Sequence, residues 1–285
     1  MAQITNQATL SYNGTVVSSN IATGEIVEVL SAAKSAVPAT YETGDNITYI
    51  ISIVNSGTTP VVGISVSDDL GGYAFDTETL YPLTYIDGTV RVYENGVLQT
   101  TPVTVKAGPP LVISGLTVPA NGNLTIVYGT KVGRTAPLGT GSSIVNTATV
   151  DGTGVTEFTA SETVTASEEP SLTITKSISP ASVTENGTLT YTFLIQNYGA
   201  GDAGAADNVK VTDTLDPVLH SLTASLDGAP LTLTADYTYD EATGLFETVE
   251  GKITVPAATY EQDAVSGTWI ATPGSTTLTI TGTVG

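Results

Sequence analysis

The stretch "KSAVPATYETGDNITYIISIVNSG" (34–57) returns without a gap as "KSISPASVTENGTLTYTFLIQNYG" (176–199). Lysine opens both copies, and a proline, a tyrosine and a final Asn-x-Gly recur at matching positions. Within each copy apolar and polar residues alternate, as in "NITYIISIV" (46–54), which predicts strands that are buried on one face. A gapless repeat of this length indicates two related β domains in one chain.

The repeat continues beyond this stretch. "ISVSDDL" (64–70) matches "VKVTDTL" (209–215), and "NLTIVYGTKVG" (123–133) resembles "TLTITGTVG" (277–285). These matches place a lysine strand, an aspartate strand and a later apolar strand in the same order in both repeats. We therefore expect one β-sandwich over residues 21–168 and a second over residues 169–285.

The two repeats end differently. Repeat one continues into "IVNTATV" (144–150), whereas repeat two has no such segment after "LTITGTVG". The same pattern stands at the start of the chain as "ITNQATL" (4–10). We therefore expect residues 1–20 to be an extension whose strand completes the second domain of another molecule.

Composition supports an all-β protein and excludes several functions. Of the 285 residues 40% are apolar, there is no cysteine, and the one histidine is His220. Disulfides, thiolate chemistry and most Ser-His or metal sites are therefore excluded, and we expect no metal and no cofactor. The net charge of −20 argues against nucleic acid as a partner, since phosphates would be repelled. Asn-Gly at 95–96 and Asp-Gly at 87–88 and 227–228 favour tight hairpins.

The sequence shows no means of export or anchoring. The start, "MAQITNQATL", lacks the basic and apolar regions of a signal peptide. No apolar stretch reaches the length of a transmembrane helix, and no sorting motif stands at the end, so we expect no membrane partner.

This layout resembles the bacterial "conserved repeat domain" family of surface proteins, also called domain of unknown function eleven. The resemblance rests on "AAKSAVP", "GDNITYIISIVNSG", "VSDDL" and "IVNTATV" with their second copies, and it weakens over 71–120 and 216–270. It implies immunoglobulin-like or collagen-adhesin-type sandwiches in surface proteins and fibres. It also implies that a Lys–Asn isopeptide bond, assisted by an acid, can form inside such a sandwich. The predicted fold is thus all-β, with two tandem immunoglobulin-like β-sandwich domains and an N-terminal donor strand.

Three residue types could supply that chemistry here. Because side chains alternate along a strand, Lys34, Asp68 and Asn146 each fall on an apolar strand face. Burial would lower the pKa of the lysine and raise that of the aspartate. A neutral amine is a nucleophile, and a protonated Asp68 could polarise the Asn146 amide. The expected product is an intramolecular Lys34–Asn146 isopeptide bond with loss of ammonia.

In repeat two Lys176 and Asp213 have no asparagine downstream. Asn6 of another subunit would complete them by strand addition at an open sheet edge, with Ile4, Ala8 and Leu10 on the same face of the donor strand. Asp68 and Asp213 are the predicted assisting acids, and the assembly would be a head-to-tail homopolymer.

Interpretations without a covalent bond or assembly remain open. Lys34 and Asp68 could form a buried ion pair with Asn146 bonded to backbone, or the lysine could point to water. The N-terminal segment could also fold back onto its own chain.

For function we expect a structural subunit of an extracellular fibre or spore appendage, deposited without a signal peptide by the mother cell. The chain would be no enzyme beyond autocatalytic bond formation. The alternative is an adhesin or S-layer-type binding module that grips an unknown surface or host ligand. For that alternative Tyr73, Tyr81 and Tyr85 are the candidate aromatic cluster.

Overall fold

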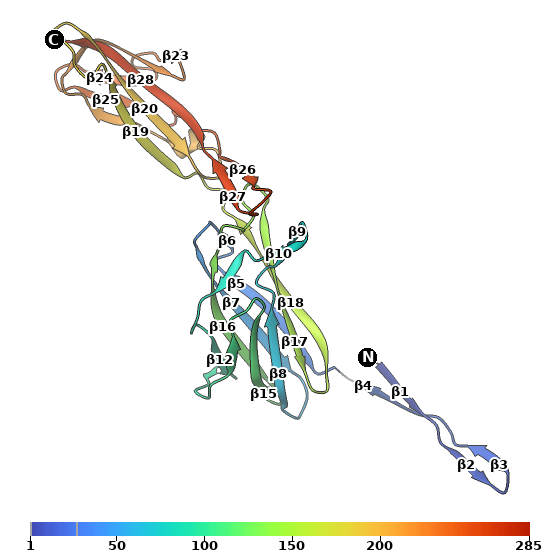
Figure 1. Ribbon diagram of the computed structural model, residues 1–285. Helices are drawn as coiled ribbons and strands as arrows, with labels where there is room; N and C mark the ends of the chain where they lie inside the picture. Colours follow the sequence, from blue (N-terminus) through green and yellow to red (C-terminus); the bar gives the residue numbers. More distant parts are fainter. Residues whose placement is uncertain (1, 27) are drawn as a thin grey trace. The chain divides into compact units, whose positions relative to one another are not determined.

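The computed structural model describes residues 2–26 and 28–285, and the predicted all-β fold is confirmed (Figure 1). Apart from one 3₁₀ turn, η1 (Ala205–Asp207), every regular element among these residues is a strand. None of the described elements is a helix long and apolar enough to cross a membrane. The chain divides into two compact units. Unit 1 comprises Met1–Ala39, Asp45–Gly133 and Val145–Thr163, and unit 2 comprises Thr40–Gly44, Arg134–Ile144 and Val164–Gly285.

Two six-stranded sheets contain the first repeat. One has the order β13-β12-β16-β7-β5, with β11 also paired to β16, and the other has the order β14-β15-β8-β17-β18-β6. The strands of the first sheet are β13 (Val97–Leu98), β12 (Arg91–Glu94), β16 (Gly122–Val132), β7 (Asn46–Asn55), β5 (Leu30–Val37) and β11 (Leu83–Tyr85). Those of the second are β14 (Thr104–Lys106), β15 (Leu111–Val118), β8 (Val61–Asp68), β17 (Ser143–Gly152), β18 (Val155–Ala166) and β6 (Thr40–Tyr41). A short hairpin of β9 (Tyr73–Phe75) and β10 (Glu78–Leu80) follows β8.

The second repeat forms a five-stranded sheet of order β19-β20-β28-β22-β23 and a three-stranded sheet of order β21-β25-β24. The strands of the larger sheet are β19 (Leu172–Ser179), β20 (Thr188–Asn197), β28 (Gly274–Val284), β22 (Leu219–Leu226) and β23 (Ala229–Pro230). The smaller sheet has β21 (Thr212–Thr214), β25 (Leu245–Thr248) and β24 (Tyr237–Asp240), and β26 (Thr259–Gln262) pairs with β27 (Trp269–Thr272).

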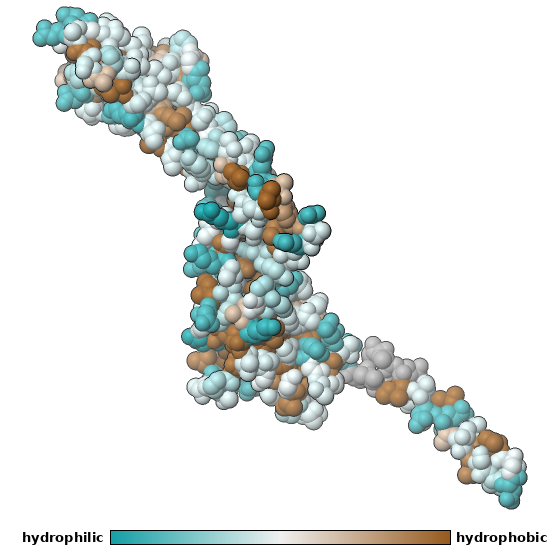
Figure 2. All heavy atoms as spheres, in the orientation of Figure 1, coloured by the Kyte–Doolittle hydropathy of each residue, from teal (hydrophilic) through white to brown (hydrophobic). Residues whose placement is uncertain are grey.

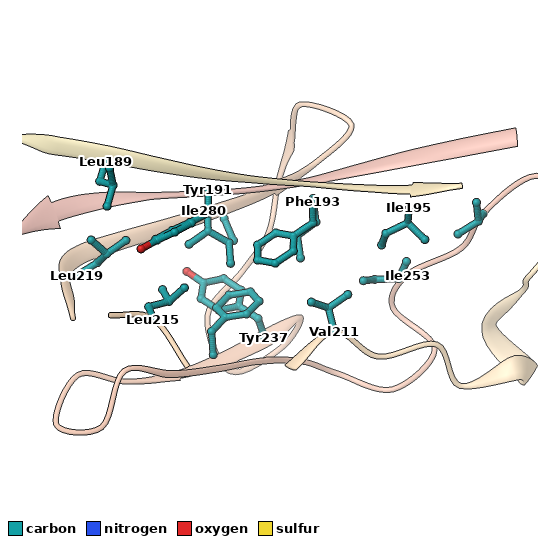
Figure 3. Packing of buried hydrophobic residues seen from close by; sticks show 14 of the residues in the cluster. Leu189, Tyr191, Phe193, Ile195, Val211, Leu215, Leu219, Tyr237, Ile253 and Ile280 are labelled. Carbon is teal, nitrogen blue, oxygen red and sulfur yellow. The ribbon is translucent and has the colours of Figure 1, made fainter. Parts of the chain in front are cut away.

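Strict alternation fixes the inward face of the central strands. On β7 the residues Ile47, Tyr49, Ile51 and Ile53 are all buried, and on β20 the same places hold Leu189, Tyr191, Phe193 and Ile195. Figure 3 shows the β20 residues packed in the core of unit 2 against Val211, Leu215 and Tyr237. The repeat in the sequence is therefore a repeat of core positions, because residues two apart on a strand share a face.

The expected hairpin turns are present at two of three sites. Asn95–Gly96 joins β12 to β13 and Asp227–Gly228 joins β22 to β23, with positive φ at all four residues. Asp87–Gly88 turns the chain as well, but the strands on either side of it, β11 and β12, both pair with β16 rather than with each other.

The two units differ at the strand that carries the aspartate. In unit 1 β8 pairs with β15 on one side and with β17 on the other. In unit 2 the matching strand is β21, and among the described residues it pairs with β25 alone. Its backbone N–H and C=O groups on the free side are therefore open to another strand.

The face of β19 is uncovered as well. Every residue of β19 is exposed, including Leu172 at 38%, Ile174 at 53% and Ile178 at 48%. On the matching strand β5, Lys34 is buried and Leu30, Ala32 and Ala36 are half-buried. An apolar row of this kind at an open sheet edge is typical of an interaction surface.

Residues 2–26, called the arm below, fold into their own antiparallel ribbon. The four strands are β1 (Ala2–Asn6), β2 (Thr9–Tyr12), β3 (Thr15–Ser18) and β4 (Ala22–Ile26), with β1 paired to β4 and β2 to β3. All side chains described in residues 4–24 are exposed, and Figure 2 shows apolar side chains on the arm surface. The apolar side chains of the arm are therefore open to a partner.

The arm differs from the expected single strand in two respects. The predicted strand 4–10 is interrupted between Asn6 and Thr9, and its partner strands continue to Ile26, past the predicted limit at residue 20. The reason is the Asn13–Gly14 turn, where both residues have positive φ and fold the segment back on itself. Pairing within the ribbon satisfies backbone groups that a lone strand would leave to water.

Candidate functional site

Lys34 and Asp68 meet inside unit 1. Lys34 comes from β5 and Asp68 from the end of β8, and the lysine Nζ lies 2.6 Å from the aspartate Oδ2. The two side chains are 0% and 1% exposed. On β8 Asp68 continues the inward row of Ile64 and Val66, so alternation alone carries a charged group into the core. The predicted juxtaposition of these two residues is therefore present.

Asn146 lies on the strand next to Asp68. On β17 Ala148 is paired with Asp68, and Asn146 shares the inward face of Ala148. The Asn146 side chain is fully buried, and neither its Nδ2 nor its Oδ1 makes a hydrogen bond. The buried Asn55 and Asn197, by contrast, both bond to nearby backbone. An unpaired buried amide is costly, so Asn146 calls for an explanation that Asn55 and Asn197 do not.

Two tyrosines that the sequence analysis did not assign to the site complete it. Tyr49 on β7 and Tyr128 on β16 are directly paired, with ring centroids 5.8 Å apart. The Tyr128 hydroxyl donates to Asp68 Oδ2 at 2.5 Å, whereas the buried Tyr49 hydroxyl has no partner. The Lys34 Nζ lies 4.8 Å from the centroid of the Tyr49 ring. A tyrosine in the inward row of each strand was visible in the sequence, but its partner across the core was not.

Burial shifts the proton affinities of this cluster. Burial lowers the pKa of Lys34, and the attraction of Asp68 acts against that shift. Burial also raises the pKa of Tyr128 well above its usual value, with the negative charge of Asp68 adding to the effect. Tyr128 therefore stays a hydrogen-bond donor, while Lys34 gives up its proton more readily than a lysine in water.

Unit 2 holds an open version of the same site. Lys176 Nζ lies 2.5 Å from Asp213 Oδ2, but these side chains are 40% and 19% exposed. The Lys176 Nζ lies 4.5 Å from the centroid of Tyr191, the counterpart of Tyr49. Opposite Tyr191 stands Ile280, where Tyr128 stands opposite Tyr49. Lys176 and Asp213 are thus brought together as predicted, and within the described residues of unit 2 no asparagine is bonded to either of them.

The predicted donor residues lie in the arm. Asn6 pairs with Ala22 and Ile4 with Gly24 in the β1–β4 ribbon, and Leu10 pairs with Val17 in the β2–β3 ribbon. Ala8 lies between the strands, and its carbonyl accepts a bond from Ser19 N–H. Ile4 and Leu10 are 51% and 64% exposed. The donor residues are therefore held in the ribbon, with the side chains of Ile4 and Leu10 open to a partner.

The alternative aromatic cluster is not an exposed platform. Tyr85 is buried in unit 1 and Tyr73 is half-buried, which leaves Tyr81 as the exposed one of the three. The three rings therefore give no support to a binding face built on them.

The two tyrosines of unit 1 allow a matched test of the hydrogen-bond network. Tyr128→Phe is expected to lower the free energy of unfolding by about 1.5–3 kcal/mol, because it removes a hydrogen bond to a buried carboxylate. Tyr49→Phe is expected to cost clearly less, because the Tyr49 hydroxyl does not bond to the carboxylate and has only the neutral Asn146 amide near it. Urea unfolding of the two variants measures the difference, and equal losses would contradict the assigned network.

Comparison with known proteins gives similarity in structure alone. No family model matches the chain, and no curated protein matches it, so the resemblance to the conserved repeat domain stays a prediction. Among solved structures, BcpA, the major pilin subunit of Bacillus cereus, is 14% identical with a TM-score of 0.37, over 96% of this chain and 73% of that one.

Two further solved structures are similar over different parts of the chain. The pilus backbone RrgB of Streptococcus pneumoniae is 13% identical with a TM-score of 0.35, and the match covers 86% of this chain and 55% of RrgB. The chain thus spans about half the length of RrgB. The collagen-binding domain of a Staphylococcus aureus adhesin is 15% identical with a TM-score of 0.30, over 47% of this chain and 95% of that domain.

Proposed function

We propose that this chain is the structural subunit of an extracellular fibre, in which the arm of one molecule completes unit 2 of the next. The observation that supports this is that the same lysine–aspartate site occurs twice in the chain, once buried and once exposed. In unit 1 the strand β17 seals Lys34 and Asp68, and in unit 2 the equivalent pair faces an open edge. The arm carries the sequence pattern of β17, with Asn6 at the place of Asn146.

Energetics favour such docking. The free edge of β21 offers unpaired backbone groups, and Leu172, Ile174 and Ile178 offer an apolar face. An inserted segment would pair these backbone groups, as β17 pairs with β8 in unit 1, and would cover the apolar face. The contact joins different surfaces of two copies, so it propagates as a filament when the rotation does not close.

We further propose an isopeptide bond in unit 1 between Lys34 and Asn146. Lys34 transfers one proton to Asp68, and the neutral Nζ attacks the Cγ of Asn146, while the protonated Asp68 polarises the amide oxygen. The Cγ–Nδ2 bond breaks, and the departing nitrogen takes up two protons, one returned by Asp68 and one given up by Nζ as it becomes an amide nitrogen. One new amide bond forms, and one ammonium ion leaves in place of the lysine charge. This product removes the unpaired Asn146 amide and the buried charge together.

The same step between Lys176 of one subunit and Asn6 of the next would make each joint covalent. Asp213 would act there as Asp68 acts in unit 1. Such a fibre suits the surface of a bacterial cell or spore. A chain of this kind has no turnover reaction, and its chemistry ends with its own cross-links.

Assembled material on a boiled denaturing gel tests this proposal. The natural chain is expected to give a ladder that resists heat and SDS, and Asn6→Ala is expected to give monomer from filaments of normal appearance. Asn20→Ala, which changes another exposed asparagine of the arm, should keep the ladder. A chain without residues 1–26 should form no filaments by electron microscopy. Filaments from that shortened chain would refute docking through the arm, and monomer in every lane would remove only the covalent joint.

A further inference from the structure

The sequence match between the arm and unit 1 extends past the donor strand. Gly14 follows Asn6 at the spacing at which Gly154 follows Asn146. Both glycines have a φ of 80°, and each ends a two-residue turn, between β2 and β3 in the arm and between β17 and β18 in unit 1. The arm is therefore built like the whole β17–β18 hairpin, and not only like its first strand.

Strand pairing agrees with this comparison. In unit 1 the hydroxyls of Thr147 and Ser161 meet at 3.0 Å across β17 and β18. When Asn146 is aligned with Asn6, Thr147 and Ser161 correspond to residues 7 and 21 of the arm. These are Gln7 and Ile21, which lie just outside β1 and β4, each next to a member of the Asn6–Ala22 pair. The two hairpins thus share the turn, and the Thr147–Ser161 contact is compatible with the pairing of Asn6 and Ala22 in the arm.

On the side of the aspartate strand, the described part of unit 2 has no strands that correspond to β17 and β18 of unit 1. In unit 1 the sheet continues from β8 through β17 to β18, whereas among the described residues the sheet of unit 2 ends at β21. The side-chain sizes are complementary as well. Unit 2 has Ile174 and Ile178 where unit 1 has Ala32 and Ala36, and the arm has Gly24 where β18 has the fully buried Val164. The arm thus has a smaller side chain, whereas β19 has larger ones, so the total packed volume stays similar.

We infer that the arm docks as a preformed hairpin, adding two strands to unit 2 of a second copy of this chain. The first strand, with Asn6, pairs with β21. The second strand, residues 15–26, becomes the new sheet edge and covers the apolar row of β19, as β18 lies beside β17 in unit 1. This inference rests on the proposed function and specifies its donor. Because the ribbon is already folded in the free chain, docking orders fewer residues than capture of a disordered strand would.

Substitutions on the two faces of β4 distinguish docking of the whole hairpin from docking of its first strand alone. Gly24 pairs with Ile4 and takes the buried place of Val164, whereas Thr23 pairs with Thr5 and points to the other face. A Cβ at Gly24 meets nothing within 4 Å in the free arm, so Gly24→Arg leaves the free arm intact. Thr23→Arg adds the same charge on the outward face and is the matched control.

The experiment measures assembly of the full chain over a dilution series by light scattering. All variants carry Asn6→Ala, so that assembly stays reversible. Gly24→Arg is expected to raise the concentration for half-maximal assembly by about a hundredfold or more, because it would bury an unpaired cation. Thr23→Arg should change it less than about threefold, which is the range of an exposed charge.

Ile4→Arg separates failure of the inference from failure of the proposed function. If Ile4→Arg blocks assembly while Gly24→Arg assembles like Thr23→Arg, the donor is a single strand and the hairpin inference is overturned. Equal loss in Gly24→Arg and Thr23→Arg would also overturn it, because the docked face would then not be specific. If Ile4→Arg assembles normally, docking through the arm itself is wrong.

Discussion

In the Asn6→Ala background, the purified chain is expected to weigh about 17 Da less than its sequence predicts, and adding Asn146→Ala should restore the calculated mass. The deficit corresponds to one ammonia lost when Lys34 and Asn146 join. Asn6→Ala removes the proposed joint between subunits, so the measurement reports unit 1 alone. Intact-protein mass spectrometry resolves this difference directly.

Loss of the cross-link should also lower stability by a large amount. The bond would close a loop of roughly a hundred residues, and for a loop of that size the lost chain entropy corresponds to about 4–5 kcal/mol. Asn146→Ala is therefore expected to reduce the free energy of unfolding by about that amount in guanidinium titrations. Asn123→Ala, at an exposed asparagine of β16, is the control and should keep both the mass deficit and the stability. A full calculated mass for the parent chain would show that unit 1 keeps a plain ion pair.

Asp68→Ala is expected to destabilise unit 1 further than Asn146→Ala, by about 3–5 kcal/mol. The variant loses the acid that assists the bond, and it also leaves the Lys34 ammonium in the core without its carboxylate. The Tyr128 hydroxyl loses its acceptor at the same time. Both effects add the cost of unpaired buried groups to the loss of the cross-link.

Replacing the whole cluster by apolar residues separates the effect of the lost cross-link from the cost of the unpaired buried groups. The triple variant Lys34→Met, Asp68→Leu and Tyr128→Phe removes the bond, the charges and the hydroxyl together. Its stability should return to within about 2 kcal/mol of Asn146→Ala, because well-packed apolar side chains can replace a buried ion pair at little cost. Circular dichroism during urea unfolding compares the three proteins. A triple variant as unstable as Asp68→Ala would mean that packing, and not the unpaired charge, accounts for the loss.

The inward position of Lys34, Asp68 and Asn146 was predictable from the sequence. Alternation along a strand is a local property of the backbone, so the apolar residues around each of the three fixed its face. The gapless repeat then carried the same argument to Lys176 and Asp213, and both predicted pairs are in contact. The turns at Asn95–Gly96 and Asp227–Gly228 follow from equally local rules.

Contacts across the sandwich could not be predicted in this way. That Tyr128 donates to Asp68, while Tyr49 beside it has no partner, depends on how two sheets pack. The difference in exposure between Lys34 and Lys176 depends on a neighbouring strand, and not on the sequence around either lysine.

The sequence by itself determined the strands, their inward faces and the duplicate order of the two repeats, because each of these follows from short-range periodicity. Only the tertiary structure decided that the arm is a paired ribbon, that β21 has one partner strand among the described residues, that β19 is exposed, and that the buried Asn146 amide makes no hydrogen bond. These features depend on which strands meet over long separations, where register and sheet packing are set by the whole core and not by any one segment.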